Sequence, residues 1–197
     1  KPKLFYMVDD QRADILFKTD IRSNDPVHIA ITTDEENAVL YVNGTALESI
    51  KLPFPLPETA DNFVVGGDHR KGNSQYFRGT IYSVNAFSEI RTEEDIIKDM
   101  MFVPRMTDGL LYSGYYSSET PITMIGSQTL RGMNFSDSNM YNTDTMFENV
   151  PATIETVIHI PYDYSERAGT IFGNYSGSND SFNLEVYSDG ILRLFYM

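Results

Sequence analysis

The sequence predicts an all-β protein, a two-sheet antiparallel jelly-roll sandwich with one short helix. Most segments alternate apolar and polar residues with a period of two and are separated by turn residues, which is typical of short antiparallel strands. One pair of such segments is joined by Asn43-Gly44, a dipeptide that favours a type I′ hairpin turn. The hydrophobic fraction of 41% and the aromatic fraction of 13% are sufficient for a packed core.

The expected strands form two groups on either side of the helix. The first group covers residues 27–31, 38–42, 45–50, 62–67 and 76–87. Thr92-Glu93-Glu94-Asp95 resembles a capping box, so we expect a helix of about two turns from Thr92 to Met101. The second group covers residues 110–116, 153–160, 170–173, 182–187 and 191–197, with a turn at 188–190. Residues 127–149 are polar, and we expect long loops there with at most a brief strand.

Charge and composition limit the classes of partner. The formal net charge of −13 repels phosphate backbones and anionic lipid headgroups, so we expect no nucleic-acid partner. No run of about 18 apolar residues occurs, so we expect no membrane insertion. The chain has no Cys, and its stability must therefore come from packing rather than from disulfides. A chain of 197 residues is consistent with a single sandwich over residues 1–197.

A short segment near the start of the sequence is nearly repeated at its end. Lys3-Leu4-Phe5-Tyr6-Met7 corresponds to Arg193-Leu194-Phe195-Tyr196-Met197, at an offset of 190 residues. The repetition is either a coincidence in an aromatic-rich sequence or a sign of a tandem array.

Two ordered blocks resemble the concanavalin-like or laminin-G-like family of bacterial surface proteins. The first lies within residues 1–101 and is similar to the family's C-terminal half; it includes Leu40-Tyr41-Val42-Asn43-Gly44 and Tyr76-Phe77-Arg78-Gly79-Thr80-Ile81. The second lies within residues 110–197 and is similar to the N-terminal half; it includes Gly169-Thr170-Ile171-Phe172-Gly173 and Asp189-Gly190-Ile191-Leu192. Residues 102–109 connect them. The halves therefore occur in reversed order, either in one closed, permuted sandwich, which we favour, or exchanged with a neighbouring repeat.

The resemblance implies a non-catalytic binding module, with carbohydrate as the expected ligand, in a larger secreted or cell-surface protein. The implied partners are a glycan or a cell-surface protein, and neighbouring repeats of the same protein. The alternative is a structural or adhesin spacer repeat in a tandem array, which the repeated segment favours.

A glycoside hydrolase is the third function to consider, because the same resemblance extends to endoglucanases with paired carboxylates on one strand face. Retaining hydrolysis needs two carboxyl groups about 5–5.5 Å apart. The sequence offers only Glu185, Asp189 and an isolated Glu155, without a Glu-x-Asp-x-Glu run. His28 and His159 alternate with apolar residues and are expected to point outward from strands rather than to bind a metal. We therefore expect no enzyme activity and name no catalytic residue.

Calcium remains an open alternative, since Ca²⁺ accepts scattered carboxylates and carbonyls without a compact motif. Acidic residues gather at Asp9-Asp10, at Asp34-Glu35-Glu36 and at Asp137 with Asp144, where solvated turn residues on an acidic surface are the favoured explanation. Family members sometimes bind Ca²⁺ beside an acidic residue of the late strand, but here Ile81 is followed by Tyr82-Ser83. No cofactor is required by the sequence, and Ca²⁺ is the one left open.

The candidate ligand-binding residues come from two loops. Residues 67–76 mix donors, acceptors and an aromatic ring, which is the combination that a sugar site needs. Asn174-Tyr175 follows a later strand and offers the same pair of groups. Ordinary strand connections would have a similar composition. The candidates are Asp68, His69, Arg70, Asn73, Tyr76, Asn174 and Tyr175.

Overall fold

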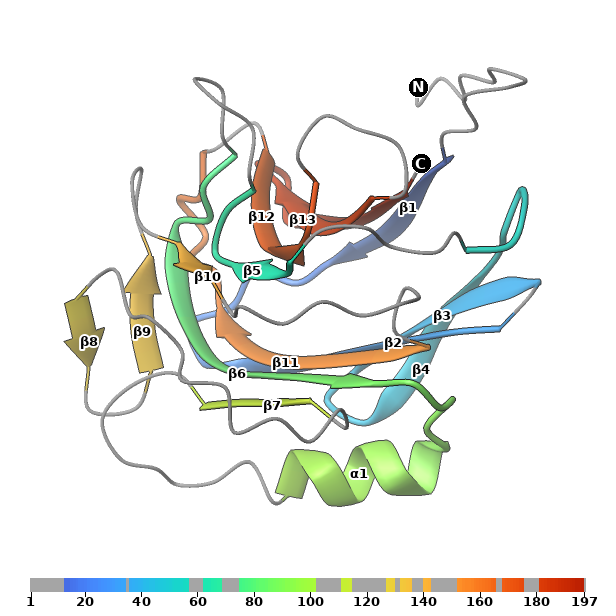
Figure 1. Cartoon of the computed structure of the whole chain (residues 1–197). Coiled ribbons are helices and arrows are strands. Elements are labelled where there is room, and N and C mark those ends of the chain that lie inside the picture. The colour runs from blue at the N-terminus through green and yellow to red at the C-terminus, as the bar shows by residue number, and fades with distance from the viewer. Residues whose placement is uncertain are drawn as a thin grey trace.

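The residues that the structure describes form a sandwich of two β-sheets, with one helix packed outside one of the sheets (Figure 1). The computed structural model describes residues 13–34, 36–56, 62–68, 75–101, 111–114, 127–129, 132–135, 140–142, 152–165, 168–175 and 181–196. Over these residues the predicted all-β sandwich fold with one short helix is confirmed.

Sheet A has six strands among the described residues, and all of its pairings are antiparallel. Their spatial order is β1 (Ala13–Asp20), β14 (Ile191–Tyr196), β13 (Phe182–Tyr187), β12 (Ala168–Gly173), β5 (Val64–Val65) and β10 (Tyr141–Asn142).

Sheet B has eight strands among the described residues. Their order is β4 (Thr45–Lys51), β3 (Asn37–Val42), β2 (Val27–Thr33), β11 (Thr153–His159), β6 (Gly79–Phe87), β9 (Gly132–Phe135) and β8 (Ser127–Thr129). The eighth strand, β7 (Leu111–Gly114), pairs with β6 in parallel.

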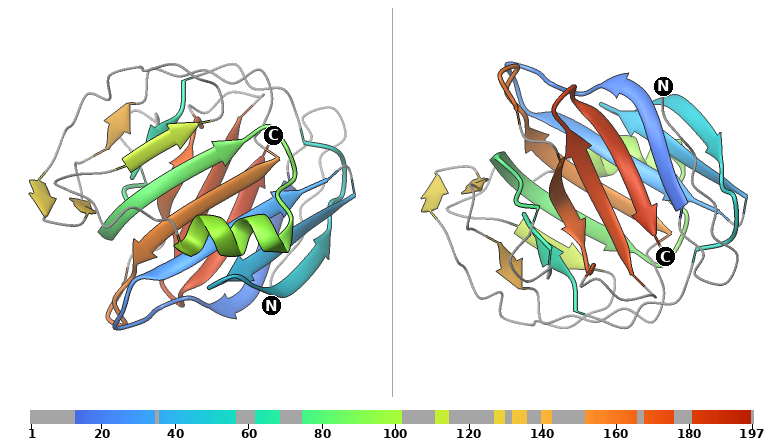
Figure 2. Two further views of the ribbon diagram at one scale, coloured as in Figure 1. Left: turned by 90° about the horizontal axis from the view of Figure 1, so that it is seen from below. Right: turned by 90° about the horizontal axis from the view of Figure 1, so that it is seen from above.

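Strands from the C-terminal part of the chain lie between strands from the N-terminal part in both sheets (Figure 2). In sheet B, β11 is hydrogen-bonded to β2 on one side and to β6 on the other, so that Glu155 is opposite both Ala30 and Asn85. In sheet A, the consecutive strands β12, β13 and β14 lie between β5 and β1. Neither sheet is therefore continuous without both parts of the chain.

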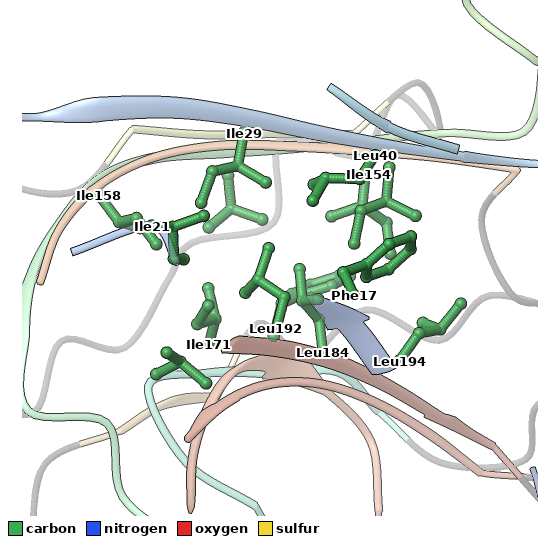
Figure 3. Packing of buried hydrophobic residues seen from close by; sticks show 14 of the residues in the cluster. Phe17, Ile21, Ile29, Leu40, Ile154, Ile158, Ile171, Leu184, Leu192 and Leu194 are labelled. Atoms are coloured by element: carbon green, nitrogen blue, oxygen red, sulfur yellow. The ribbon is translucent and has the colours of Figure 1, made fainter. Parts of the chain in front are cut away.

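The inner faces of the two sheets enclose one hydrophobic cluster (Figure 3). Residues spaced by two along each strand supply it, as Leu184 and Val186 do from β13. Phe172 and Phe182 come from β12 and β13, and Phe63 precedes β5; the rings of Phe63 and Phe172 stack with centroids 4.9 Å apart. Complete burial of one such ring stabilises the fold by about 1.5–3 kcal/mol, so the cluster favours keeping both parts of the chain together.

The β3–β4 hairpin has the predicted turn. Asn43 and Gly44 both have positive φ, 50° and 78°, as a type I′ turn requires. The Asn43 side chain accepts a hydrogen bond from the backbone N–H of His28 at 3.0 Å, which ties the turn to β2. Gly44 also lies beneath the helix, because a Cβ atom there would be 3.0 Å from the Ile97 side chain.

The helix α1 (Glu93–Met101) begins at the predicted capping box. The Asp95 N–H donates to the Thr92 hydroxyl at 3.2 Å, and the Asp95 carboxylate accepts from the Thr92 N–H at 3.3 Å. Ile96 is completely buried, and Arg91 just before the helix donates its N–H to the Thr153 hydroxyl on β11. The helix therefore covers the outer face of sheet B (Figure 1).

Among the helical residues that the structure describes, no span has the length and apolar character needed to cross a membrane.

The strand pattern differs from the expectation in two places. Strand β1 was not expected, although Ala13, Ile15 and Phe17 alternate toward the core; the adjacent Leu16 on the other face obscures that period. At most one brief strand was expected in residues 127–149, and this is wrong, because β8, β9 and β10 all form there. These strands have two to four residues each, too few to give a recognisable alternation.

The Glu48 carboxylate links β4 of sheet B to β1 of sheet A. Glu48 on β4 accepts hydrogen bonds from the backbone N–H groups of Lys18 and Thr19 at 2.9 and 2.6 Å and from the Thr19 hydroxyl at 2.5 Å. Lys18 and Thr19 lie where the register of β1 with β14 is interrupted, so their N–H groups need another acceptor. Partial burial raises the pKa of Glu48, but these hydrogen bonds outweigh it and hold the pKa below its ordinary value.

We expect Gly44→Val to destabilise the protein by about 2 kcal/mol, because a β-branched residue is strained at positive φ and would press on Ile97. The matched variant Thr45→Val changes an exposed strand residue and should alter stability by less than about 0.5 kcal/mol. In thermal unfolding the difference is a midpoint about 4–8 °C lower for Gly44→Val. Equal midpoints would contradict the turn assignment.

We expect Glu48→Gln to cost about 1 kcal/mol at neutral pH and to change the pH dependence of unfolding. A carboxyl whose pKa is lowered by folding stabilises the protein above its unfolded pKa, and the contribution disappears as the pH falls through the folded pKa. The difference between wild type and variant in urea unfolding should therefore shrink from pH 7 to pH 3. A constant difference would show that the carboxylate charge is irrelevant.

Candidate functional site

The first candidate loop is anchored at its two described ends. Asp68 is completely buried and accepts a hydrogen bond from the backbone N–H of Gln75 at 3.4 Å. Tyr76 is half-buried and forms a bridge with Thr170 on β12. These contacts close the loop across its base. His69, Arg70 and Asn73 lie outside the described residues.

The second candidate pair lies at the end of β12. Asn174 is completely buried, and its side-chain oxygen accepts from the N–H of Phe182 at 2.8 Å. The backbone N–H of Asn174 donates to the Phe182 carbonyl at 2.9 Å, so the residue closes the connection between β12 and β13. Tyr175 is half-buried, with its ring edge against Phe195 at a centroid distance of 4.9 Å.

The structure does not bring the two candidate groups together. Tyr76 lies beside Thr170, whereas Asn174 follows β12 four residues later. Four residues of extended chain correspond to about 13 Å. A ligand that contacts both groups would have to extend along most of β12.

A polar network crosses the outer face of sheet A, and its residues were not among the candidates. We call Asp14, Asn183, Glu185, Tyr187 and Arg193 the sheet A cluster. The Arg193 guanidinium binds Glu185, with Nε 2.8 Å from the carboxylate, and its Nη1 donates to Asp14 on β1 at 2.9 Å. Asn183 donates to Glu185 at 3.1 Å. The network therefore links three neighbouring strands.

Two aromatic rings flank this network. Arg193 lies over the ring of Tyr187, 4.9 Å from its centroid, and 5.5 Å from that of Phe195. Burial alone lowers the pKa of Arg193, but Glu185, Tyr187 and Asp14 together raise it above its ordinary value, so the guanidinium stays charged. Glu185 is buried, while Tyr187 and Tyr175 remain partly exposed. The face offers hydrogen-bonding groups beside aromatic rings.

The sequence contains a signal for the sheet A cluster. Asn183, Glu185 and Tyr187 alternate along one strand and therefore share a face. The turn at residues 188–190 places Glu185 directly opposite Arg193 in the ladder. A comparison of the outward-facing residues of the two predicted strands, 182–187 and 191–197, would have identified the pair of Glu185 and Arg193.

The three carboxylates considered for hydrolysis lie in three different surroundings. Glu185 is paired with Arg193 on sheet A, and Asp189 is exposed in the following turn, where it accepts the Ile191 N–H at 3.2 Å. Glu155 lies on the outer face of sheet B, opposite Ala30. These three residues therefore do not form a catalytic pair.

His28 points to the outer face of sheet B, as expected, but that face is covered. His28 is only 4% exposed, and its Nε2 lies 3.5 Å from the carboxylate of Glu155, which is 1% exposed. Both lie on the outer face of sheet B, which α1 covers, so period two predicted the face correctly but not its burial. Burial raises the pKa of Glu155, and the contact with His28 opposes this rise only in part. His159 is half-buried at the end of β11.

In the described part of the chain, no three His, Cys, Asp or Glu side chains are grouped closely enough to hold a metal ion. Asp34 instead accepts the backbone N–H groups of Glu36 and Asn37 at 2.7 and 2.5 Å, as a turn residue does. Of the other acidic positions, Asp9, Asp10, Glu35, Asp137 and Asp144 lie outside the described residues.

We expect Glu155→Gln to remove a pH dependence of the opposite sign to that of Glu48. A carboxyl whose pKa is raised by folding stabilises the protein below its unfolded pKa, and this contribution is lost as the pH rises through the folded pKa. Wild-type stability should therefore fall relative to that of the variant between pH 4 and pH 7, by about 1.4 kcal/mol for each unit of pKa shift. Parallel curves in denaturant unfolding would contradict the buried pair.

Residues 3–97 of the chain match the family described as the concanavalin A-like lectin/glucanases superfamily. No curated protein and no solved structure matches the chain. The matched residues include β1 to β6 and the first part of α1; these strands are four of the eight described strands of sheet B and the strands β1 and β5 of sheet A. Residues 3–97, just under half of the chain, are similar to the concanavalin A-like lectin/glucanases superfamily, and the two-sheet architecture is consistent with that similarity.

Proposed function

We propose that the protein is a non-catalytic carbohydrate-binding module of an extracellular or cell-surface protein, and that the glycan binds at the outer face of sheet A. The observation that carries the proposal is the sheet A cluster, in which Arg193, Glu185 and Asp14 are held beside the ring of Tyr187. The similarity of residues 3–97 to a superfamily named for lectins and glucanases supports a sugar as the ligand.

The chemistry of the cluster suits a neutral sugar. Sugar hydroxyl groups both donate and accept, and Asp14 and Arg193 supply one acceptor and one donor at the same place. The half-exposed rings of Tyr187 and Tyr175 offer apolar faces for the C–H groups of a pyranose. Because each polar group is already positioned by another, little side-chain freedom would be lost on binding.

Charge favours a neutral rather than an acidic glycan. The cluster holds two carboxylates, Asp14 and Glu185, against the single guanidinium of Arg193. The whole chain carries a formal charge of −13, which adds a repulsive field for anionic polysaccharides. A neutral ligand avoids both costs.

The same contacts support a binding role without hydrolysis. A general acid must reach the leaving group of its substrate. Glu185 is only 1% exposed, and its carboxylate already accepts hydrogen bonds from Arg193 and Asn183. Glu185 is therefore suited to position Arg193 and poorly placed to protonate a leaving group.

Two other elements of the earlier expectation stay as predictions. The loop of Asp68 and Tyr76 could form a second contact at the other end of β12, and a Ca²⁺ ion could bind at acidic residues outside the described part of the chain. The spacer-repeat alternative is favoured by one observation, the near repetition of Lys3–Met7 at residues 193–197.

We expect Tyr187→Ala to weaken glycan binding about tenfold, because it removes the ring against which the sugar would stack. Neutral oligosaccharides that bind on a glycan array would be carried forward to affinity electrophoresis, where the wild type is compared with the variant. Tyr162→Ala is the matched control, since Tyr162 is 60% exposed and lies outside the cluster.

The same binding measurements distinguish a site on the outer face of sheet A from a site at the loop of Tyr76. If binding is lost with Tyr76→Ala but kept with Tyr187→Ala, the ligand binds the loop and the assignment to sheet A is wrong. If no neutral glycan is retained at millimolar concentration, the carbohydrate function itself is wrong and the spacer role is left.

A further inference from the structure

Two buried polar side chains on the outer face of sheet B have incomplete hydrogen bonding. Glu155 on β11 and His28 on β2, which we call the sheet B pair, are 1% and 4% exposed. Among the described residues, neither carboxylate oxygen of Glu155, nor Nδ1 of His28, nor the hydroxyl of Ser83 on β6 has a hydrogen-bond partner. Buried polar atoms nearly always have such a partner, so this arrangement is costly.

One proton makes the sheet B pair electrically neutral. The proton can be carried by His28 or by Glu155, and in both cases the pair buries no net charge. When the proton is lost, Glu155 is an ionised carboxylate beside a neutral imidazole, and no described group donates a hydrogen bond to it. An ionised group without hydrogen bonds is far more costly to bury than a neutral one, and water relieves that cost only if the cover over the pair opens.

The cover is α1, and few side chains attach it to the sheet. In the left view of Figure 2, α1 lies over β11 and β2. Of residues 93–100, whose side chains the structure describes, only Ile96 is fully buried, and Ile97 is 39% exposed. The burial of one isoleucine and the cost of one buried carboxylate without hydrogen bonds are of the same order. The charge on Glu155 is therefore sufficient to shift the balance between an attached and a detached helix.

The segment before α1 is attached more firmly and forms a hinge. The Arg91 N–H donates to the Thr153 hydroxyl at 2.9 Å, and that hydroxyl donates to the Glu89 carbonyl at 2.8 Å. The Arg91 guanidinium also lies over the ring of Phe87, 4.7 Å from its centroid. These contacts fix the start of α1 to β11 and β6, so the helix can move away from the sheet while its start stays in place.

We propose that α1 is a pH-dependent flap, hinged at Arg91, which is closed while the sheet B pair holds a proton and opens when the pair loses it. Opening allows water to hydrate the Glu155 carboxylate and uncovers the outer face of β11 and β2.

The other charged groups near Glu155 do not replace the lost proton. Burial raises the pKa of Glu155, and the contact with His28 lowers it to a smaller extent. Asp99 on α1 raises the pKa of Glu155 further, whereas Arg91 lowers it. Arg91 and Asp99 bind each other at 2.5 Å, so their effects on Glu155 oppose each other.

The neighbouring positions on the sheet add no further charge close to the pair. Asn85 of β6 is directly opposite Glu155, and Tyr41 of β3 lies in the same row two strands away. His159 is on β11 itself, four residues from Glu155, which corresponds to about 13 Å. Among the described residues, the titration beneath the flap therefore belongs to the sheet B pair.

Hydrogen exchange of the full chain tests the flap. The amides of α1 and of β13 are followed from pH 5 to pH 8, with correction for the intrinsic pH dependence of exchange. We expect α1 to be less protected than β13 and to respond less to low concentrations of urea, because opening the flap exposes less surface than global unfolding. One common protection and urea dependence for both elements would show that α1 opens only with the whole fold, and would overturn the proposal.

Glu155→Gln is the decisive variant, because Gln cannot ionise. A carboxyl whose pKa is raised in the closed state favours closure at low pH and loses this effect as the pH rises through that pKa. Protection of α1 in the wild type should therefore fall with rising pH, by about tenfold for each unit by which closure raises the pKa. In Glu155→Gln it should not fall. Glu155→Met, which is apolar and similar in length, should behave in the same way and replaces the Gln variant if that does not fold.

Glu94→Gln is the matched control. Glu94 is an exposed carboxylate on α1 that pairs with Lys98 at 2.9 Å, so this variant makes the same chemical change away from the sheet B pair. It should retain the wild-type fall in α1 protection. A fall that persists in Glu155→Gln, or one that disappears in Glu94→Gln, would overturn the proposal. No readout involves a glycan, so the result is independent of the proposed binding function.

Discussion

The structure depends on the insertion of one part of the chain between strands of the other. β11 completes sheet B between β2 and β6, and β12 to β14 complete sheet A between β5 and β1. Backbone hydrogen bonds on both edges of the inserted strands would be lost together if either part moved, and unpaired buried backbone groups are costly. The core has the same dependence, because Ile29 and Leu40 of one part pack with Leu184 and Leu192 of the other (Figure 3). The insertion of β11 to β14 therefore determines both the strand order and the stability of the fold.

Polar side chains are accommodated differently on the two outer faces of the sandwich. On sheet B, α1 covers the face, and His28 and Glu155 are buried side by side, with His28 Nε2 3.5 Å from the Glu155 carboxylate. Such a pair is costly to bury and contributes little to stability. On sheet A, Glu185 and Asp14 share Arg193, and the network continues to partly exposed tyrosines. The first arrangement suits a covered face, whereas the second leaves groups for a ligand.

The sequence predicted what local chemistry determines. Asn43-Gly44 specified the β3–β4 turn, and Thr92 with Asp95 specified the start of α1, because each signal acts over a few residues. The alternation of side chains along a strand also predicted which residues share a face, as for Asn183 and Glu185. This alternation carries no information on whether another element covers that face. The burial of His28 could not be predicted for that reason, since α1 lies far from it in sequence. The candidate residues Asp68 and Asn174 were chosen for their polarity, and the structure places both in buried hydrogen bonds that close loops.

Arg193 separates the two roles of β14. A strand that served only to fill the core would need Leu194 and Tyr196, whose side chains are buried. The guanidinium of Arg193 adds nothing to the core, because it lies on the outer face over the ring of Tyr187 and binds Glu185 and Asp14 there. The inner face of β14 therefore serves the fold, whereas its outer face shapes the surface to which we propose that a ligand binds.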